Sequence, residues 1–134
     1  MSPPARTRKS DNDVVATRRD TGFILPLADA LAHLPLPPTP RWPDGQFHRE
    51  GLVTPGLSAG IFAPRGKDWQ STHPRDELYV VVAGDATLEL DGTEHEVRLG
   101  DLIFVPAGVD HRFCRIGEGF ATWVMFFDQT PEST

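Results

Sequence analysis

The stretch STHPRDELYVVVAG, residues 71–84, decides how the middle of this chain folds. Its second half is apolar and β-branched, which is typical of a buried strand. Its first half places His73, Pro74 and the adjacent acids Asp76 and Glu77 within five residues. The stretch therefore has two interpretations, a polar turn that leads into a core strand or two side chains directed at a metal ion.

The distance between His73 and Glu77 depends on the chain between them. In an extended strand, residues four positions apart share a face but lie about 13 Å from each other, too far to share an ion. Pro74 suits the second position of a type I turn, and Asp76 suits the same turn. The segment HPRD therefore predicts a turn that brings His73 back toward Glu77. A first helical turn would also join the two, but LYVVVAG has the composition of a strand.

Alternation of apolar and polar residues continues on both sides of this stretch and predicts an all-β fold. Short segments with turns between them are predicted as strands: residues 46–53, 57–64, 77–84, 86–92, 93–99, 101–106, 110–116 and 120–127. The Asp91-Gly92 pair is the strongest hairpin signal, because glycine supplies the positive φ of a tight turn. Short, regularly spaced strands without intervening helices predict an antiparallel barrel or jelly-roll sandwich.

The N-terminal part of the chain has a different pattern. Residues 1–20 mix charges, proline and polar side chains, and they are predicted to form a flexible tail because they bury too little to offset the entropy of ordering. Residues 21–45 predict one short helix, in which leucines recur at helical spacing, and a proline-rich connector. The barrel is expected over residues 46–130.

Composition narrows the class of partner. The chain has 134 residues, enough for one domain with a modest core. Its formal net charge of -6 gives no cationic face for nucleic acid. No apolar run approaches the roughly 18 residues of a membrane span, and the single cysteine, Cys114, cannot form an internal disulfide. These observations predict a cytoplasmic protein whose partner is a small molecule, not nucleic acid and not a membrane.

A second polar cluster surrounds a predicted strand in residues 100–111, GDLIFVPAGVDH. A glycine–aspartate pair predicts one turn, and Pro106 with Gly108 predicts another that presents His111 at the start of the next strand. Two strands that meet at one mouth of a barrel can direct this histidine and the earlier histidine and glutamate at one spot. Two imidazoles and one carboxylate form a metal-binding triad that leaves coordination positions open.

The two segments resemble the two motifs of the cupin superfamily. The positions that keep the family's residue types and spacing are His73, Glu77, Gly84, Gly100, Pro106, Gly108 and His111. The resemblance covers roughly residues 46 to 128 and implies an antiparallel double-stranded β-helix, the cupin jelly-roll barrel. It also implies that the two histidines and the glutamate are the ligands of one divalent metal ion.

Three positions depart from the family pattern. Ser71 stands where the family usually has its first histidine, the opening glycine falls one place late at Gly66, and Arg115 replaces the closing asparagine. The usual site of four ligands would therefore shrink to three, with water or Ser71 beside the open positions. The chain also resembles a small subgroup of single-domain cupins with a similar H-x-x-D-E-L-Y-V-V line.

Further side chains are predicted to line the cavity: Ser71, Tyr79, Phe113, Trp123, Met125 and His48. The tyrosine and the phenylalanine share the strand faces of the predicted ligands, although plain core packing is the alternative for both. The tryptophan and the methionine alternate on one face of the last strand, where they would either wall the pocket or pack the sheets. For the histidine, exposure to solvent is the alternative.

The resemblance implies a small-molecule enzyme of the dioxygenase or isomerase type. Imidazole and carboxylate ligands accept iron, manganese, nickel and zinc, so the residue types do not select the metal. No catalytic residue is assigned beyond the ligands. The alternatives are a non-catalytic binding module and a metal-free structural barrel. Cupins usually dimerise through sheet edges, so a homodimer is also expected.

Overall fold

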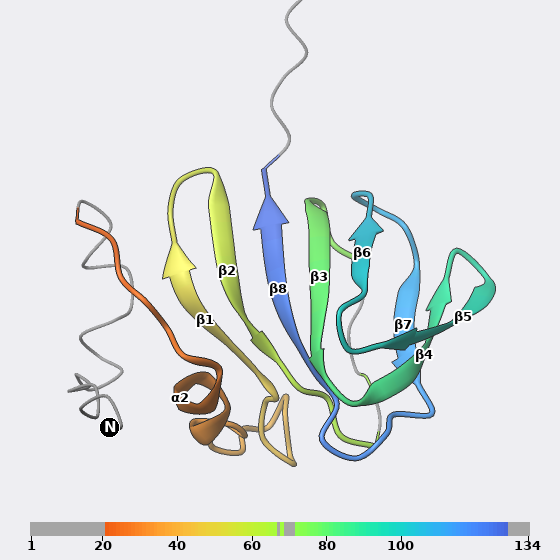
Figure 1. Cartoon of the computed structure of the whole chain (residues 1–134), viewed down its shortest axis with the longest axis horizontal. Coiled ribbons are helices and arrows are strands. Elements are labelled where there is room, and N and C mark those ends of the chain that lie inside the picture. The colour runs from red at the N-terminus through yellow and green to blue at the C-terminus, as the bar shows by residue number, and fades with distance from the viewer. Residues whose placement is uncertain (1–20, 67, 69–71, 129–134) are drawn as a thin grey trace, which may run out of the picture.

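The computed structural model describes residues 21–66, 68 and 72–128, and the chain forms eight strands and one short helix there (Figure 1). All of the predicted strands are present, with ends that shift by one or two residues. They are β1 (His48–Val53), β2 (Leu57–Phe62), β3 (Asp76–Ala83), β4 (Asp85–Leu90), β5 (Thr93–Arg98), β6 (Leu102–Val105), β7 (His111–Cys114) and β8 (Ala121–Phe127). The helix, α2, spans Leu27–Ala32.

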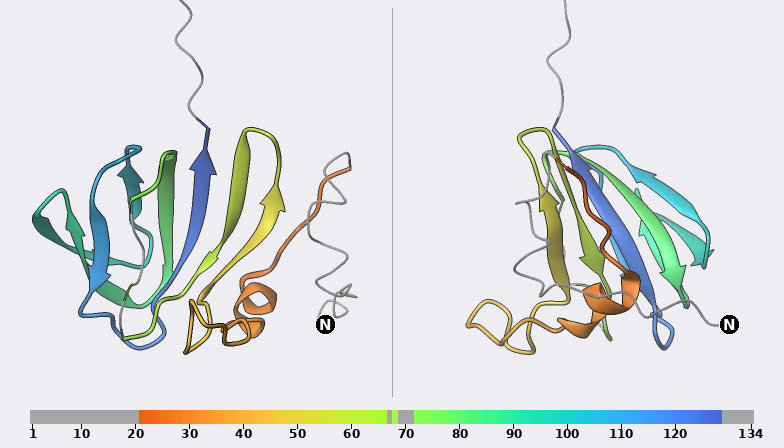
Figure 2. Two further views of the ribbon diagram at one scale, coloured as in Figure 1. Left: turned by 180° about the vertical axis from the view of Figure 1, so that it is seen from behind. Right: turned by 60° about the vertical axis from the view of Figure 1, so that its left-hand side comes forward.

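The strands form two sheets, a five-stranded one in the order β1-β2-β8-β3-β6 and a three-stranded one in the order β5-β4-β7. Every pairing within them is antiparallel. Figure 2 shows the larger sheet twisting across the molecule and the smaller one flanking its β3–β6 end. The predicted antiparallel jelly roll with one short N-terminal helix is therefore confirmed.

Two glycine turns fix how β4 is joined to its neighbours. Asp91 and Gly92 link β4 to β5 with φ of 49° and 81°, the positive values that a two-residue hairpin turn requires. Gly84 separates β3 from β4 with φ of 69°, and a Cβ there would lie 2.9 Å from the backbone of Phe120. The motif glycine at position 84 is thus required by both the backbone conformation and the close approach of the segment that leads into β8.

Apolar side chains from both sheets meet between them and form the core. The inward face of β3 carries Glu77, Tyr79 and Val81, and all three are almost fully buried. Tyr79 and Phe113 of β7 contact edge to face, with ring centroids 5.0 Å apart. The core cluster consists of Phe62, Tyr79, Val81, Ala86, Leu88, Val97, Ile103, Val105, Phe113, Phe120, Val124 and Phe126. Packing around Tyr79 therefore fixes the direction in which Glu77, two residues earlier on the same face, points.

The helix covers part of the outer face of the five-stranded sheet. Ala30 and Leu34 pack there against Ile61, Ala63 and Ala121 in a second apolar cluster. Beyond the helix the connector folds back, and the Leu36 amide donates to the Gln46 carbonyl at 2.8 Å just before β1. The predicted tail, residues 1–20, lies outside the described residues. None of the helices in the described part of the chain is long and apolar enough to cross a membrane.

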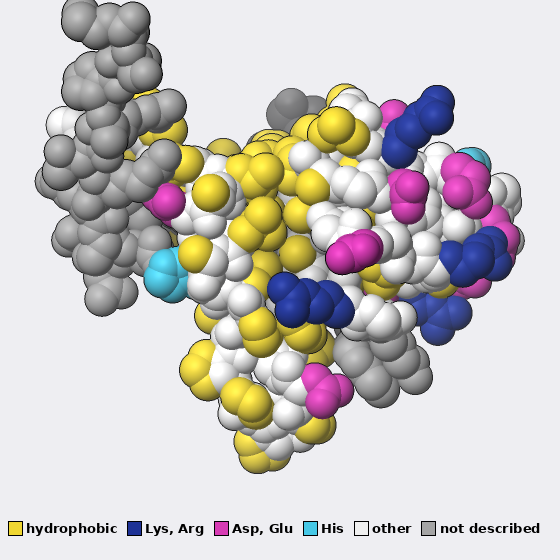
Figure 3. Space-filling view, turned by 60° about the horizontal axis from the view of Figure 1, so that its bottom comes forward, with side chains coloured by type: hydrophobic (Ala, Val, Ile, Leu, Met, Phe, Trp, Pro, Cys, Tyr) yellow, Lys and Arg dark blue, Asp and Glu magenta, His cyan; other side chains and the backbone are white. Residues whose placement is uncertain are grey.

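Many charged side chains lie on the side of the molecule formed by β4, β5 and β7 (Figure 3). Figure 3 shows hydrophobic side chains over the middle and lower part of one face, and acidic and basic ones at its right, the side on which β4, β5 and β7 lie in Figure 1. On β5 only Val97 is buried. The outer arm of the β4–β5 hairpin is therefore a solvated, charged surface.

Candidate metal centre

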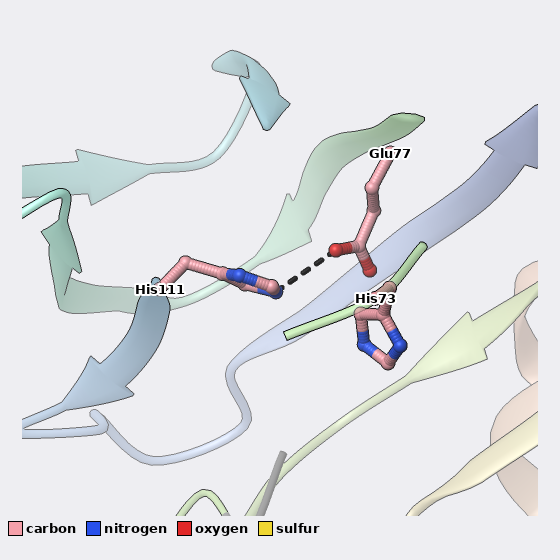
Figure 4. Close-up of side chains that lie close together, drawn as sticks. All are labelled: His73, Glu77 and His111. Atoms are coloured by element: carbon pink, nitrogen blue, oxygen red, sulfur yellow. Dashed lines mark ion pairs between the residues drawn. The ribbon is translucent and has the colours of Figure 1, made fainter. Parts of the chain in front are cut away.

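Residues from both sheets bring the three predicted ligands together. His73 lies just before β3, Glu77 is the second residue of β3, and His111 is the first residue of β7. One ligand atom from each of the three lies within 4.8 Å of the other two. Figure 4 shows the carboxylate and both imidazole rings directed at a common region, with the ion pair between His111 and Glu77 marked. The chain between His73 and Glu77 therefore does return, as the sequence predicts.

The backbone around His73 is held by the second polar segment. The chain bends at Pro74 and Arg75. The carbonyl of His73 accepts a hydrogen bond from the Gly108 amide at 2.8 Å. The Asp76 carboxylate accepts another from the Ala107 amide at 2.9 Å, so its side chain bonds to the second segment. These two bonds tie the two motif segments to each other and set the position of His73 relative to His111.

Glu77 is a buried carboxylate with an exposed fraction of 1%. A buried charge is costly unless it is paired. The Oε1 atom lies 2.9 Å from Nε2 of His111, but the two groups are not aligned as a hydrogen bond. Within the described residues, the other carboxylate oxygen and Nε2 of His73 also have no hydrogen-bond partner. An ion pair between His111 and Glu77 would leave these two atoms unsatisfied.

The other nitrogen of His111 fixes its tautomer. Its Nδ1 lies 2.9 Å from the carbonyl of Val109, and a carbonyl can only accept a hydrogen bond. Nδ1 therefore carries a proton, and in the neutral ring Nε2 presents a lone pair to the carboxylate of Glu77. A histidine that donates one ring N–H to a backbone carbonyl and offers the other nitrogen is the usual arrangement of a metal ligand.

Burial lowers the pKa of the histidines, whereas nearby carboxylates raise it. Burial lowers the pKa of His73 and of His48, and it outweighs the effect of nearby carboxylates. Burial also lowers the pKa of His111, but the Glu77 carboxylate and the Val109 carbonyl outweigh it and leave that pKa raised. Burial and the nearby Glu77 carboxylate raise the pKa of Tyr79 well above its usual value. Of the two imidazoles in the triad, His73 thus favours the neutral form near pH 7, which is the form that binds metals, whereas Glu77 favours the protonated form of His111.

The buried atoms of the triad match the requirements of a divalent ion. Two imidazole nitrogens and a carboxylate converge, and no described residue donates a well-aligned hydrogen bond to them. Such a donor set suits iron, manganese, nickel and zinc alike. The residues present therefore fit a metal ion.

A pocket of about 400 Å³ lies beside the triad, with His73 in its wall. Its other lining residues are Arg41, Trp42, Gly45, Gln46, Phe47, His48, Glu50, Phe62, Pro64, Asp68, Arg75 and Phe126. The connector before β1 thus contributes one wall, which its sequence did not indicate. A small-molecule site of this size lies at the lower end of the usual range.

Of the residues predicted to line the pocket, some do so and others belong to the core. His48 lines the pocket, and its Nε2 is buried. Tyr79 and Phe113 belong to the core beneath the triad, and the ring of Tyr79 lies 6.1 Å from that of His111. Ser71, the position of the family's first histidine, lies outside the described residues.

The placement of Trp123 and Met125 corrects the prediction that they line the pocket. Glu77 pairs directly with Phe126 in the register of β3 and β8, so Phe126 shares the inward face and its neighbours in sequence point outward. Trp123 packs with the α2 cluster on the outer face of the sheet. The ring of Phe126 lies 4.9 Å from that of His73. The pocket residue from β8 is therefore Phe126.

Sequence reasoning also missed Asp68. Its side chain has an exposed fraction of 4%, and its Oδ2 accepts a hydrogen bond from the Phe113 amide at 2.9 Å. The carboxylate thus supports β7 two residues after His111. It lies between Gly66 and His73 of the first motif, at a position for which the motif specifies no residue type, so no signal in the sequence pointed to it.

Comparisons with known proteins agree with this architecture. The family model described as the cupin domain matches residues 60–127. An uncharacterised protein of Streptomyces coelicolor is 38% identical over 88 residues, which cover 66% of this chain and 80% of that protein. A conserved Streptococcus pyogenes protein of unknown function has a TM-score of 0.53 and 23% identity, over 64% of this chain and 75% of its own. A Ralstonia eutropha protein described as a candidate mannose-6-phosphate isomerase has a TM-score of 0.51 and 28% identity, over 61% and 83% respectively.

Proposed function

We propose that this chain, which belongs to the cupin domain family, binds one divalent metal ion through His73, Glu77 and His111 and acts on a small molecule in the adjacent pocket. The observation that carries the proposal is the convergence of buried ligand atoms without hydrogen-bond partners among the described residues. When bound, such an ion supplies Lewis-acid or redox chemistry. The enzyme class that we propose is a dioxygenase or an isomerase.

Different residues of the chain would bind the ion, orient a metal ligand and line the pocket. His73, Glu77 and His111 would hold it, and the Val109 carbonyl keeps Nε2 of His111 available. Phe62 and Phe126 contribute aromatic rings to the lining of the pocket. The Ralstonia eutropha protein, described as a candidate isomerase of a sugar phosphate, supports the isomerase alternative by its fold.

Metal content tests the proposal directly. We expect protein that is purified without added metal, or reloaded with iron, manganese, nickel or zinc, to retain about one ion per chain after gel filtration. Elemental analysis measures this ratio. Absence of bound metal under every one of these conditions would falsify the proposal. Where metal is retained, oxygen uptake and product analysis with a metabolite panel distinguish an enzyme from a non-catalytic binder.

We also propose that the protein is a cytoplasmic homodimer. Cys114 is a free thiol, as a reducing compartment favours. The larger sheet ends at the edge strands β1 and β6, and Leu102 and Phe104 of β6 are exposed, with exposed fractions of 68% and 53%. Unpaired edges and exposed apolar side chains favour pairing with a second copy.

Light scattering tests the dimer. We expect twice the chain mass of 14.8 kDa for the wild type. The double variant Leu102→Glu, Phe104→Glu is expected to elute as a monomer, because it places charges on the proposed interface. A wild-type mass equal to one chain would rule out the dimer.

A further inference from the structure

We infer that the pocket beside the triad binds a small organic acid, whose carboxylate pairs with Arg75 while its other end reaches the metal centre. The second half of this statement rests on the proposed function. The pairing with Arg75 does not, because it follows from the pocket's own side chains. His73 belongs both to the triad and to the pocket wall, so one molecule can contact both.

The Arg75 side chain is held at the pocket by Phe126, but the polar contacts of its N–H groups are long. Its guanidinium lies over the ring of Phe126, 4.6 Å from the ring centroid. Its other contacts are long: Nη1 lies 3.3 Å from Oγ of Ser58 and 3.9 Å from the exposed carboxylate of Asp128. A guanidinium has five N–H donors in a planar fork that matches a carboxylate. The contact with Phe126 therefore holds the guanidinium at the pocket while leaving N–H donors for a ligand.

Phe126 connects the arginine to the triad and to His48. Its ring contacts that of His73 at 4.9 Å and that of His48 at 6.3 Å. The guanidinium and the two imidazoles thus surround one aromatic ring. Both histidines also experience the positive charge of Arg75, which contributes to lowering the pKa of each, after burial. A molecule lying along this ring would reach all three polar groups.

The charges that line the pocket favour an anion once a metal is present. Two arginines, Arg41 and Arg75, and two acids, Glu50 and Asp68, line the pocket. The Asp68 carboxylate already accepts the Phe113 amide. Because these four charges cancel, the net charge of the pocket depends on the metal centre. There the two positive charges of a divalent ion would exceed the single negative charge of Glu77. The pocket as a whole is then cationic.

His48 supplies a second polar contact for the ligand. Its Nε2 is buried and finds no hydrogen-bond partner among the described residues, although it lines the pocket. Buried polar groups without partners are costly. A carboxylate or hydroxyl oxygen of a bound acid would provide the missing partner.

Calorimetric titration of the zinc-loaded protein tests this inference. The probes are straight-chain dicarboxylic acids of three to six carbons and the monocarboxylic acids of equal length. We expect at least one dicarboxylic acid to bind about tenfold or more tightly than its monocarboxylic counterpart, as one charge-assisted bidentate pair would give. Arg75→Gln should remove that preference without changing the zinc content, and Arg75→Lys should keep part of it.

The matched control is Arg112→Gln, which removes an exposed arginine that pairs with Glu89 on the solvent-facing side of β4 and β7 and does not line the pocket. It should retain the preference in full.

Saturable binding of no acid, or an unchanged preference in Arg75→Gln, would overturn the inference while leaving the metal proposal intact. If the wild type holds no metal, the proposed function fails. Monocarboxylic acids are then compared with their amides: preference for the acid that depends on Arg75 supports the pairing, and equal binding overturns it.

Discussion

The variant His111→Ala is expected to lose its bound metal while the barrel stays folded. The substitution removes an imidazole whose tautomer is fixed by a backbone carbonyl, that of Val109. Loss of an outer-shell partner alone typically weakens metal binding 10–100-fold, so removal of a direct ligand should weaken it by more than about 100-fold. Dialysis of the metal-loaded variant followed by elemental analysis measures the loss.

The matched control is His95→Ala, because His95 lies exposed on β5, away from the triad. It should retain the metal content of the wild type. Acidification should release metal from the wild type in the same assay, since the ring nitrogens must lose their protons to coordinate. The raised pKa of His111, which Glu77 and the Val109 carbonyl cause against the effect of burial, makes this nitrogen the first to be protonated as the pH falls. Equal metal content in His111→Ala and His95→Ala would contradict the assignment of His111.

The strands and the meeting of the triad could be predicted because local signals specify both. Alternation or a short apolar, β-branched run marks the strands, and the Asp91-Gly92 turn leaves one register for its hairpin. The approach of His73 to Glu77 follows from Pro74, which ends the extended path. What the spacing did not reveal is the second restraint: the Gly108 amide bonds to the His73 carbonyl, a contact between segments 35 positions apart.

The face of β8 could not be chosen from the sequence. A shift of one residue moves every side chain to the other face, and a strand with apolar residues on both faces gives no sign of which one points inward. Here Trp123 and Met125 face outward because α2 covers part of that side of the sheet, while Val124 and Phe126 face the core. Only the pairing of Phe126 with Glu77 decides between the two, and pairing is a property of the tertiary structure.

The contacts by which distant segments support the site could not be predicted from sequence patterns either. Asp68 reaches the Phe113 amide across 45 positions, and the connector at Trp42 reaches the pocket wall. Neither residue occupies a position that a period or a motif specifies. The residues that hold a site in place are therefore harder to predict than the residues that form it, because family spacing records only the latter.

The core beneath the site should be much more sensitive to substitution than the turns around it, and two leucines allow a matched test. Leu88 of β4 has an exposed fraction of 1%, and it pairs with Phe113 in the register of β4 and β7. Leu88→Ala should lower the free energy of unfolding by about 2–5 kcal/mol, from lost burial and the cavity that remains. Leu99, in the turn before β6, has an exposed fraction of 66%. Leu99→Ala should therefore change the free energy of unfolding by no more than about 0.5 kcal/mol.

Urea unfolding of both variants in metal-free buffer measures the difference, and the metal-free condition matters because a ligand that binds only the folded state adds stability of its own. β4 also pairs with the strand that begins at His111, through Leu90. A loosened β4 should therefore weaken metal retention in Leu88→Ala as well, while Leu99→Ala retains the ion. Equal destabilisation by the two substitutions would contradict the position of the core between the two sheets.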